Sequence, residues 1–233
     1  MAPSPAAGKA APGDKGAGIQ PELLRDLRAF RGALFDLDGV LADSMRVWDP
    51  ICRDWLRGRG EEPEPGLEDR IAPMTLEQSA GYLRRAYRIE LPPADIIKQW
   101  EGMVLDQYRT GIALKRESAA IAGELYRAGL RLAVVTSCFP AACEAFLDRQ
   151  GIRPWFSALV YAGEGGGDKS QSGVWLSAAQ RIGVKARDCV VFEDSLHALP
   201  GVRAAGMAFA AVYDPSCKDW DALKSGADFA VFA

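Results

Sequence analysis

The chain has 233 residues, of which 48% are hydrophobic and 25% are charged, and its formal net charge at pH 7 is −3. These values are typical of an ordinary globular protein, and the length allows one large domain or a domain with a smaller insertion. Without a basic block or an apolar run near the ~20 residues of a membrane span, nucleic acid and membranes are not expected partners.

The first twenty residues are not expected to fold. They are mainly Ala, Pro, Gly and Lys, and such a segment buries too little apolar surface to offset the entropy lost on ordering. We therefore predict a disordered tail over residues 1–28. The segment also lacks the apolar stretch of a signal peptide, which makes the cytoplasm the expected compartment.

A buried strand is predicted next, followed by a helical insertion. The apolar run at residues 33–35 indicates the strand. Residues 47–112 then contain three helical patterns, and Thr75 is the expected N-cap of one of them, with Gln78 three residues later. Trp and Tyr stripes at helical spacing are interpreted as the core of this segment rather than as a ligand cage. We predict that residues 47–112 form an all-helical inserted domain.

From residue 113 onward, apolar runs alternate with amphipathic segments. The predicted strands cover residues 131–137, 157–163, 188–194 and 207–213, and the predicted helices cover residues 117–129, 140–150, 172–183 and 195–206. Buried strands separated by helices indicate βαβ units and a parallel sheet with both faces covered. Residues 29–46 and 113–233 are therefore predicted to form an α/β core domain with a doubly wound, Rossmann-like parallel sheet.

Polar side chains follow the predicted strands where they end, which is where ligands bind in such folds. Asp36 and Asp38 follow the first strand, and Gly39 then allows a sharp turn and a close approach to a ligand. Three further groups are a hydroxyl pair, a cation and two carboxylates, at Thr136 and Ser137, Lys169, and Glu193 and Asp194.

Each group alone has a simpler explanation. An Asp-x-Asp sequence often forms a turn, a Thr-Ser pair or an acidic pair suits a helix N-terminus, and a loop lysine is usually solvated. Together, however, the acids, the hydroxyl pair and the cation supply the groups that metal-assisted phosphoryl transfer needs. His197 is the only histidine, which excludes chemistry built on several histidines, and five cysteines without CxxC spacing indicate reduced thiols.

Residues 34–44, 134–137, 169 and 190–195 together resemble the motifs of the haloacid dehalogenase-like phosphatase superfamily, in the branch around β-phosphoglucomutase. The resemblance covers roughly residues 30 to 215. It implies that residues 47–112 form a cap domain that closes over the active site. It also implies phosphoryl transfer to an aspartate with the help of Mg²⁺.

The resemblance implies a role for each matching position. Asp36 would be the nucleophile that forms an aspartyl-phosphate, and Asp38 would be the general acid and base. Mg²⁺ would be held by oxygen atoms of Asp36, Asp38, Glu193 and Asp194. The phosphate oxygens would be bound by Gly39, Thr136, Ser137 and Lys169.

The lysine motif is irregular. The family follows this lysine with a Pro-x-Pro-Asp run, whereas residues 170–173 read Ser-Gln-Ser-Gly, and the missing prolines are expected to loosen the loop. Residues 163–170 are also one residue away from a nucleotide-binding P-loop, but Asp168 stands where that loop requires glycine. A nucleotide kinase is therefore a minor alternative, and a phosphate-binding pseudoenzyme is another.

The main alternative within the family is a phosphomutase. A mutase must bind two phosphates, and the β-phosphoglucomutases carry basic residues on the cap turn that corresponds to residues 71–76. Ala72 and Leu76 stand there in this chain, and Trp48 stands where those enzymes have a histidine. Arg84 and Arg85 lie further along, where a solvated helix face is the simpler interpretation. The lack of basic residues at positions 72 and 76 and the tryptophan at position 48 both favour a phosphatase over a mutase.

The sequence therefore predicts a Mg²⁺-dependent phosphatase that acts on a small phosphorylated metabolite, namely a sugar or polyol phosphate. A dehalogenase is disfavoured, because Asp38 and the acids at 193–194 serve metal and proton chemistry that carbon–halogen displacement does not need. The expected assembly state is a monomer or a weak homodimer.

Overall fold

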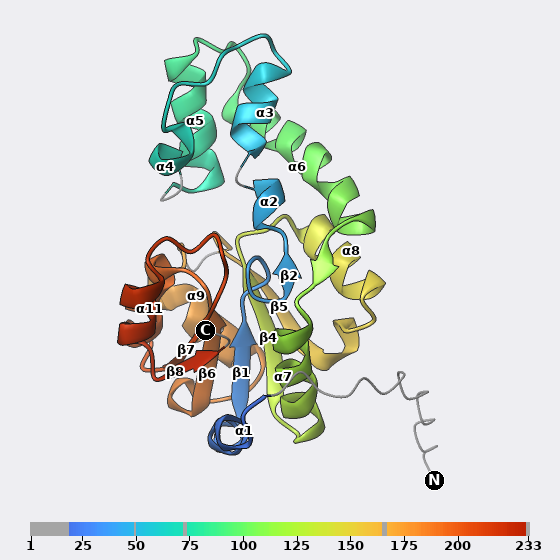
Figure 1. Cartoon of the computed structure of the whole chain (residues 1–233), viewed down its shortest axis with the longest axis vertical. Helices are drawn as coiled ribbons and strands as arrows, with labels where there is room; N and C mark the ends of the chain where they lie inside the picture. Colours follow the sequence, from blue (N-terminus) through green and yellow to red (C-terminus); the bar gives the residue numbers. More distant parts are fainter. Residues whose placement is uncertain (1–18, 49, 72–73, 165–166, 232–233) are drawn as a thin grey trace.

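A parallel sheet of six strands forms the centre of the computed structural model, which describes residues 19–48, 50–71, 74–164 and 167–231. β1 (Gly32–Phe35) lies between β4 (Arg131–Thr136) and β6 (Cys189–Glu193) and runs parallel to both. The outer strands are β5 (Phe156–Tyr161), β7 (Ala208–Val212) and β8 (Phe229–Val231), and the order is β5-β4-β1-β6-β7-β8. The predicted doubly wound α/β sheet is confirmed (Figure 1).

Helices cover both faces of the sheet (Figure 1). One apolar core contains residues of α1 (Pro21–Leu27), α7 (Arg116–Arg127) and α8 (Pro140–Arg149), and the other contains residues of α9 (Ser172–Arg181), α10 (Leu199–Ala204) and α11 (Trp220–Gly226). Successive strand residues point to opposite faces, so Phe35 belongs to the first core and Leu34 to the second. Short 3-10 turns occur at Arg153–Trp155, Ala186–Asp188 and Leu196–Ala198.

The described helices between residues 45 and 110 form a lobe beyond the carboxyl ends of the strands (Figure 1). They are α2 (Met45–Trp48), α3 (Ile51–Arg57), α4 (Leu67–Ile71), α5 (Leu76–Ala86) and α6 (Pro93–Thr110). Thr75 caps α5 as predicted, because its side chain accepts from the Gln78 N–H at 3.2 Å and its own N–H donates to the Gln78 side chain at 2.9 Å. Trp55 and Trp100 are buried inside the lobe and pack edge to face.

A two-stranded sheet joins the lobe to the core. β2 (Ala42–Asp43) pairs antiparallel with β3 (Ala113–Leu114), so the chain leaves the core and returns to it side by side. This arrangement brings the end of α6 next to the turn after β1. The division of the chain into a core domain and a cap domain at the predicted boundaries stays a prediction.

The predicted disordered tail extends too far along the chain. Residues 21–27 fold as α1, which begins with a proline and buries Leu27 completely, and Arg28 then pairs with Glu124 of α7 at 2.8 Å. Leu23 and Leu27 are four residues apart and so lie on one helix face. The rest of the predicted tail, residues 1–18, lies outside the described residues. None of the described helices is both long and apolar enough to cross a bilayer.

Candidate active site

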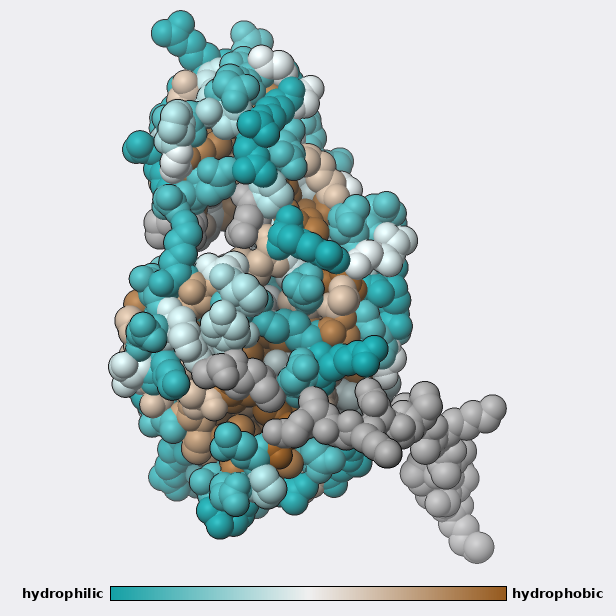
Figure 2. All heavy atoms as spheres, viewed as in Figure 1, coloured by the Kyte–Doolittle hydropathy of each residue, from teal (hydrophilic) through white to brown (hydrophobic). Residues whose placement is uncertain are grey.

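A cavity of about 670 Å³ lies where the carboxyl ends of the strands face the helical lobe. Figure 2 shows a gap at this level between the helical lobe and the core. Six of the eight residues that the motifs single out line this cavity, namely Asp36, Asp38, Ser137, Lys169, Glu193 and Asp194. The motifs therefore converge on one site, as expected for a doubly wound sheet.

Asp36 lies beside a buried lysine. Its carboxylate forms an ion pair with Lys169 Nζ, which also donates to Glu193 Oε2 at 3.0 Å, and all three side chains are buried. Burial by itself would lower the pKa of Lys169, but the carboxylates of Asp36 and Glu193 raise this pKa above its usual value. The lysine therefore stays charged, and the irregular loop has not displaced it from Asp36.

Asp36, Glu193 and Asp194 form a cluster of buried carboxylates. One oxygen atom from each lies within 4.8 Å of the other two. Burial, followed by the charges of Glu193 and Asp36, raises the pKa of Asp194 well above its usual value. Since Lys169 is the buried cation of this cluster, the ionised carboxylates would carry excess negative charge. A hard divalent cation with oxygen ligands, such as Mg²⁺, fits this donor set.

Gly39 lies against Asp194 rather than at the cavity. Its φ of +78° is in the left-handed region, and a Cβ at this position would come within 2.0 Å of Asp194 Oδ2. Glycine is therefore needed so that the Asp194 carboxylate can lie against this turn. The Gly39 N–H donates to the Ala42 carbonyl at 2.9 Å, so the structure does not bring it to the cavity as the predicted phosphate contact requires.

The predicted hydroxyl pair is divided between the cavity and the core. Ser137 lines the cavity, whereas Thr136 is fully buried and does not. Thr136 Oγ1 accepts from the Cys138 N–H at 2.9 Å, which is a local turn contact that threonine often makes. The Thr136 oxygen thus makes a contact in the turn after β4, where it helps to position Ser137, and its predicted contact with phosphate stays a prediction.

Asp38 is held by two hydroxyl groups from different elements. Ser44 Oγ donates to Asp38 Oδ1 at 2.5 Å, and the Tyr108 hydroxyl at the end of α6 donates to the same oxygen. Burial and the charge of Asp36 raise the pKa of Asp38 to about 6, whereas the two hydroxyls act to lower it. A carboxyl group with this pKa is suited to exchange protons near neutral pH. No pattern in the sequence indicates that Tyr108 belongs to this site.

Other contacts take the place of the prolines that the Lys169 loop lacks. Asp168 Oδ1 accepts from the Ser170 N–H at 2.7 Å, and Trp175 Nε1 donates to the Lys169 carbonyl at 2.9 Å. Gly201 of α10 lies close to the loop, because a Cβ there would be 2.2 Å from the Lys169 carbonyl oxygen. These contacts fix the loop backbone next to the lysine. Residues 165–166 of the same loop lie outside the described residues.

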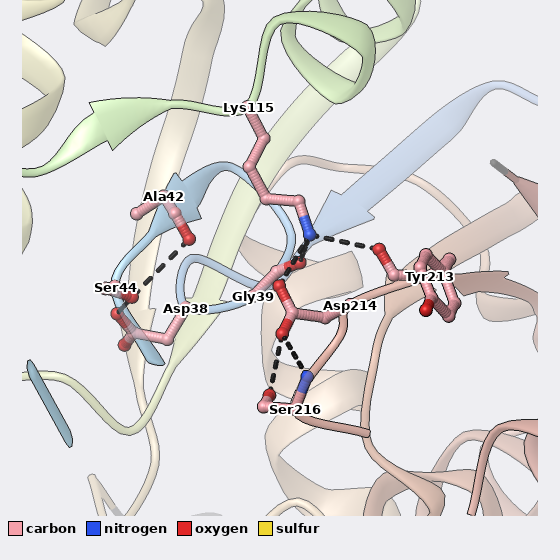
Figure 3. Close-up of polar contacts among 8 residues, drawn as sticks. All are labelled: Asp38, Gly39, Ala42, Ser44, Lys115, Tyr213, Asp214 and Ser216. Atoms are coloured by element: carbon pink, nitrogen blue, oxygen red, sulfur yellow. Dashed lines mark hydrogen bonds and ion pairs between the residues drawn. The ribbon is translucent and has the colours of Figure 1, made fainter. Parts of the chain in front are cut away.

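Lys115 joins the turn after β1 to the loop after β7 (Figure 3). Its Nζ donates to the Gly39 carbonyl at 2.6 Å and to the Tyr213 carbonyl at 3.0 Å, and it pairs with Asp214 Oδ2 at 2.7 Å. The second oxygen of Asp214 accepts from the Ser216 N–H at 2.9 Å. Lys115 directly follows β3, where the chain returns from the lobe to the core. Its side chain therefore links this point to the turn after β1, from which the chain leaves for the lobe.

We expect Asp214→Asn to destabilise the protein at pH 7 by about 2–3 kcal/mol, because it leaves the largely buried Lys115 ammonium without its carboxylate. Although burial opposes it, bonding to Lys115 and Ser216 lowers the pKa of Asp214 in the folded state. The stabilisation is therefore complete above the ordinary value of 3.8 and is lost as the pH falls below it.

Urea unfolding of wild type and Asp214→Asn between pH 7 and pH 3 measures this difference. The difference in the free energy of unfolding between the two proteins should shrink toward acid pH. Asp221→Asn, at an exposed position, serves as a matched control that should unfold like the wild type. A gap that stays constant with pH would contradict the assignment of this stabilisation to the Asp214 carboxylate.

The wall of the cavity opposite the motifs comes from the helical lobe. It is mostly apolar with one acidic side chain, and its described members are Met45, Trp48, Met74, Thr75, Leu76 and Glu77. Pattern analysis could not identify these residues, because the face that a helix turns toward the cavity depends on how the lobe packs on the core. Trp48 is an exception to the predicted aromatic core, since it lines the cavity.

Comparison with known proteins identifies relatives of this chain. The family described as haloacid dehalogenase-like hydrolase matches residues 30–206. Hexitol phosphatase A of Escherichia coli is 29% identical over 188 residues, which cover 80% of this chain and 84% of that protein. Fructose-1-phosphate phosphatase YqaB of Escherichia coli is 41% identical over 76 residues, which cover 33% of this chain and only 40% of that protein.

A solved structure with the same fold supports the architecture. A mutant of CbbY from Rhodobacter sphaeroides, in complex with xylulose-(1,5)bisphosphate, superposes with a TM-score of 0.76 at 22% identity. The match covers 87% of this chain and 93% of that one. At this identity the likeness bears on the fold alone.

Proposed function

The chain belongs to the haloacid dehalogenase-like hydrolases, and from this membership we propose that it is a Mg²⁺-dependent phosphatase acting on a small sugar or polyol phosphate. The observation that carries the proposal is the position of Asp36, which lines the cavity beside the Lys169 ammonium and two further carboxylates. The names of the two Escherichia coli relatives support the phosphatase activity and the substrate class.

In this proposal Asp36 attacks the phosphorus atom and becomes an aspartyl-phosphate, which divides one difficult displacement into two easier ones. Lys169 holds the Asp36 carboxylate in place and adds positive charge beside the phosphoryl oxygens. Ser137 is placed to bind one of these oxygens from the end of β4. Mg²⁺, held by the carboxylates of Asp36, Glu193 and Asp194 and by the backbone carbonyl of Asp38, would offset the repulsion between the Asp36 carboxylate and the phosphate.

Asp38 handles the proton in both half-reactions. It protonates the leaving alcohol when the phosphoryl group moves to Asp36, and it then deprotonates the water that hydrolyses the aspartyl-phosphate. Its pKa of about 6 supports both roles, because neither protonation state is costly to reach near neutral pH. The lobe would exclude bulk water from this exchange and contact the alcohol part of the substrate.

We propose that the substrate carries a single phosphate. Among the described residues that the lobe contributes to the cavity there is no lysine or arginine, and Glu77 there would repel a second phosphate. Residues 72–73, which lie outside the described part, are Ala and Pro and bring no charge. A mutase, which must hold two phosphates, is therefore disfavoured. A nucleotide kinase is also disfavoured, because Lys169 pairs with carboxylates.

A screen of phosphorylated metabolites for Mg²⁺-dependent phosphate release tests the proposal. We expect hydrolysis of hexose and hexitol monophosphates, and weak or no hydrolysis of sugar bisphosphates. Phosphorus NMR of β-glucose 1-phosphate with the enzyme should show inorganic phosphate without glucose 6-phosphate. Formation of glucose 6-phosphate would support the mutase, and the absence of any phosphate release would support a binding protein.

A further inference from the structure

Two aromatic side chains where the lobe meets the core are linked to Asp38 by hydrogen bonds. Trp48 Nε1 donates to the Tyr108 hydroxyl at 2.5 Å, and this hydroxyl donates to Asp38 Oδ1. The two rings pack edge to face with their centroids 6.5 Å apart, and Tyr108 is completely buried. The two residues come from the two segments that connect the lobe to the sheet, α2 and the end of α6.

The direction of these hydrogen bonds is fixed by the donor chemistry. An indole N–H can only donate, so it occupies a lone pair of the Tyr108 oxygen and leaves the tyrosine proton for Asp38. Ser44 lies beside Asp38 (Figure 3) and donates to the same Oδ1 at 2.5 Å, whereas its other acceptor, the Ala42 carbonyl, is 3.4 Å away. Asp38 Oδ1 therefore accepts two hydrogen bonds, one from each hydroxyl.

The two oxygens of the Asp38 carboxyl group differ in their hydrogen bonds. Both hydrogen bonds that described side chains donate to the Asp38 carboxyl group end on Oδ1. When Asp38 is protonated, its proton therefore resides on Oδ2. Asp38 lines the cavity, whereas Tyr108 and Ser44 do not, so the oxygen that is not held by the two hydroxyls is the one available to a substrate.

We infer that Tyr108, oriented by Trp48, is a positioning residue that keeps Asp38 Oδ1 as a hydrogen-bond acceptor and leaves Oδ2 to deliver the proton to the leaving group. This inference rests on the proposed function, because it needs Asp38 as the general acid. Its chemistry is balanced: the phosphorus–oxygen bond to the alcohol breaks as the bond to Asp36 forms, and the Oδ2 proton moves to the alcohol oxygen. Asp38 is left as a carboxylate that two hydroxyls stabilise.

Tyr108→Phe tests the inference, because it removes the hydroxyl and keeps the ring. The measurement is kcat/KM for p-nitrophenyl phosphate, whose leaving group departs without a proton, and for a hexitol phosphate, whose leaving group needs one. This parameter reports only the steps up to departure of the leaving group. We expect the variant to lose at least about tenfold more kcat/KM on the hexitol phosphate than on p-nitrophenyl phosphate. Tyr126→Phe, on the exposed side of α7, should change neither value.

Other outcomes separate the inference from the proposed function. Equal losses on both substrates, or no loss on either, would overturn the positioning role while the phosphatase stands. A wild-type protein that hydrolyses neither ester would instead refute the phosphatase itself. Trp48→Phe provides a second variant that removes the indole N–H and keeps an aromatic, though smaller, ring, and we expect the same preference in its losses, about threefold in size. If Tyr108→Phe fails to fold by circular dichroism, the Trp48→Phe result decides.

Discussion

Asp36→Asn is expected to abolish phosphate release, lowering kcat by roughly 10³-fold or more, because an amide oxygen does not attack phosphorus. The fold should survive the change. Asp36 is one of three buried carboxylates within 4.8 Å of one another, and its charge raises the pKa of Glu193 and of Asp194. Removing this charge relieves repulsion, and Lys169 keeps its 3.0 Å contact with Glu193.

Two measurements make the test decisive. Phosphate release from the best substrate gives the loss of activity, and thermal unfolding shows that the variant is folded. Asp106→Asn, on an exposed position of α6, is a matched control that should keep full activity. Mass spectrometry of rapidly quenched wild-type enzyme should also detect a phosphorylated peptide that contains Asp36 and is missing in the variant. If the variant retained more than about 1% of the activity, Asp36 could not be the nucleophile.

The sheet could be predicted from the sequence because its strands are buried on both faces. A strand such as residues 189–193 is buried along its whole length and apolar up to its last residue, Glu193, and this pattern alternates clearly with the helices. The prediction failed where the apolar signal is short. β8 has only three residues and lies at the sheet edge, and α4 has five residues, so each spans fewer than two repeats of its period. α1 was missed because the low-complexity segment before it dominated the interpretation.

The site was predictable where its residues follow strands, and not elsewhere. The position after a parallel strand is fixed by the sheet, which is why Asp36, Lys169 and Asp194 meet in the structure as expected. Tyr108 and Lys115 reach the same region from the connection between lobe and core, where sequence separations of 70 and 76 residues hide their contacts with the turn after β1. No local pattern marks such contacts, because they depend on how the lobe is attached.

Gly39 and Thr136 show a second limit. Both are predicted phosphate contacts, and this stays a prediction, but the sequence could not show that each also makes a supporting contact. In the structure, the Gly39 N–H donates to the Ala42 carbonyl, and the Thr136 hydroxyl oxygen accepts from the Cys138 N–H. Both residues therefore shape the turns that carry Asp38 and Ser137. Which backbone groups remain available to a ligand depends on local hydrogen bonding that residue type alone does not fix.

Removal of Mg²⁺ is the second change that we expect to have a large effect on activity. With a chelator, phosphate release should fall to the background rate, because the buried carboxylates near Asp36 would then face a phosphate dianion with Lys169 as their buried cation. Mg²⁺ should also raise the melting temperature in the absence of substrate, since a ligand that binds only the folded state stabilises it. At a concentration of about 100 times Kd the gain is about 2.7 kcal/mol, or roughly 5–10 °C for a chain of this size.

Asp194→Asn separates the metal from the nucleophile. Asp194 contributes one of the three cluster oxygens, and the variant leaves Asp36 and Lys169 in place. We expect it to lose most of the Mg²⁺-induced rise in melting temperature together with activity, whereas Asp106→Asn should keep both. Because the pKa of Asp194 is raised, protons compete with Mg²⁺ for the carboxylate, so the Mg²⁺-induced rise in wild type should weaken as the pH falls. An unchanged rise in Asp194→Asn would place the metal elsewhere, and full wild-type activity with the chelator would exclude a metal from the reaction.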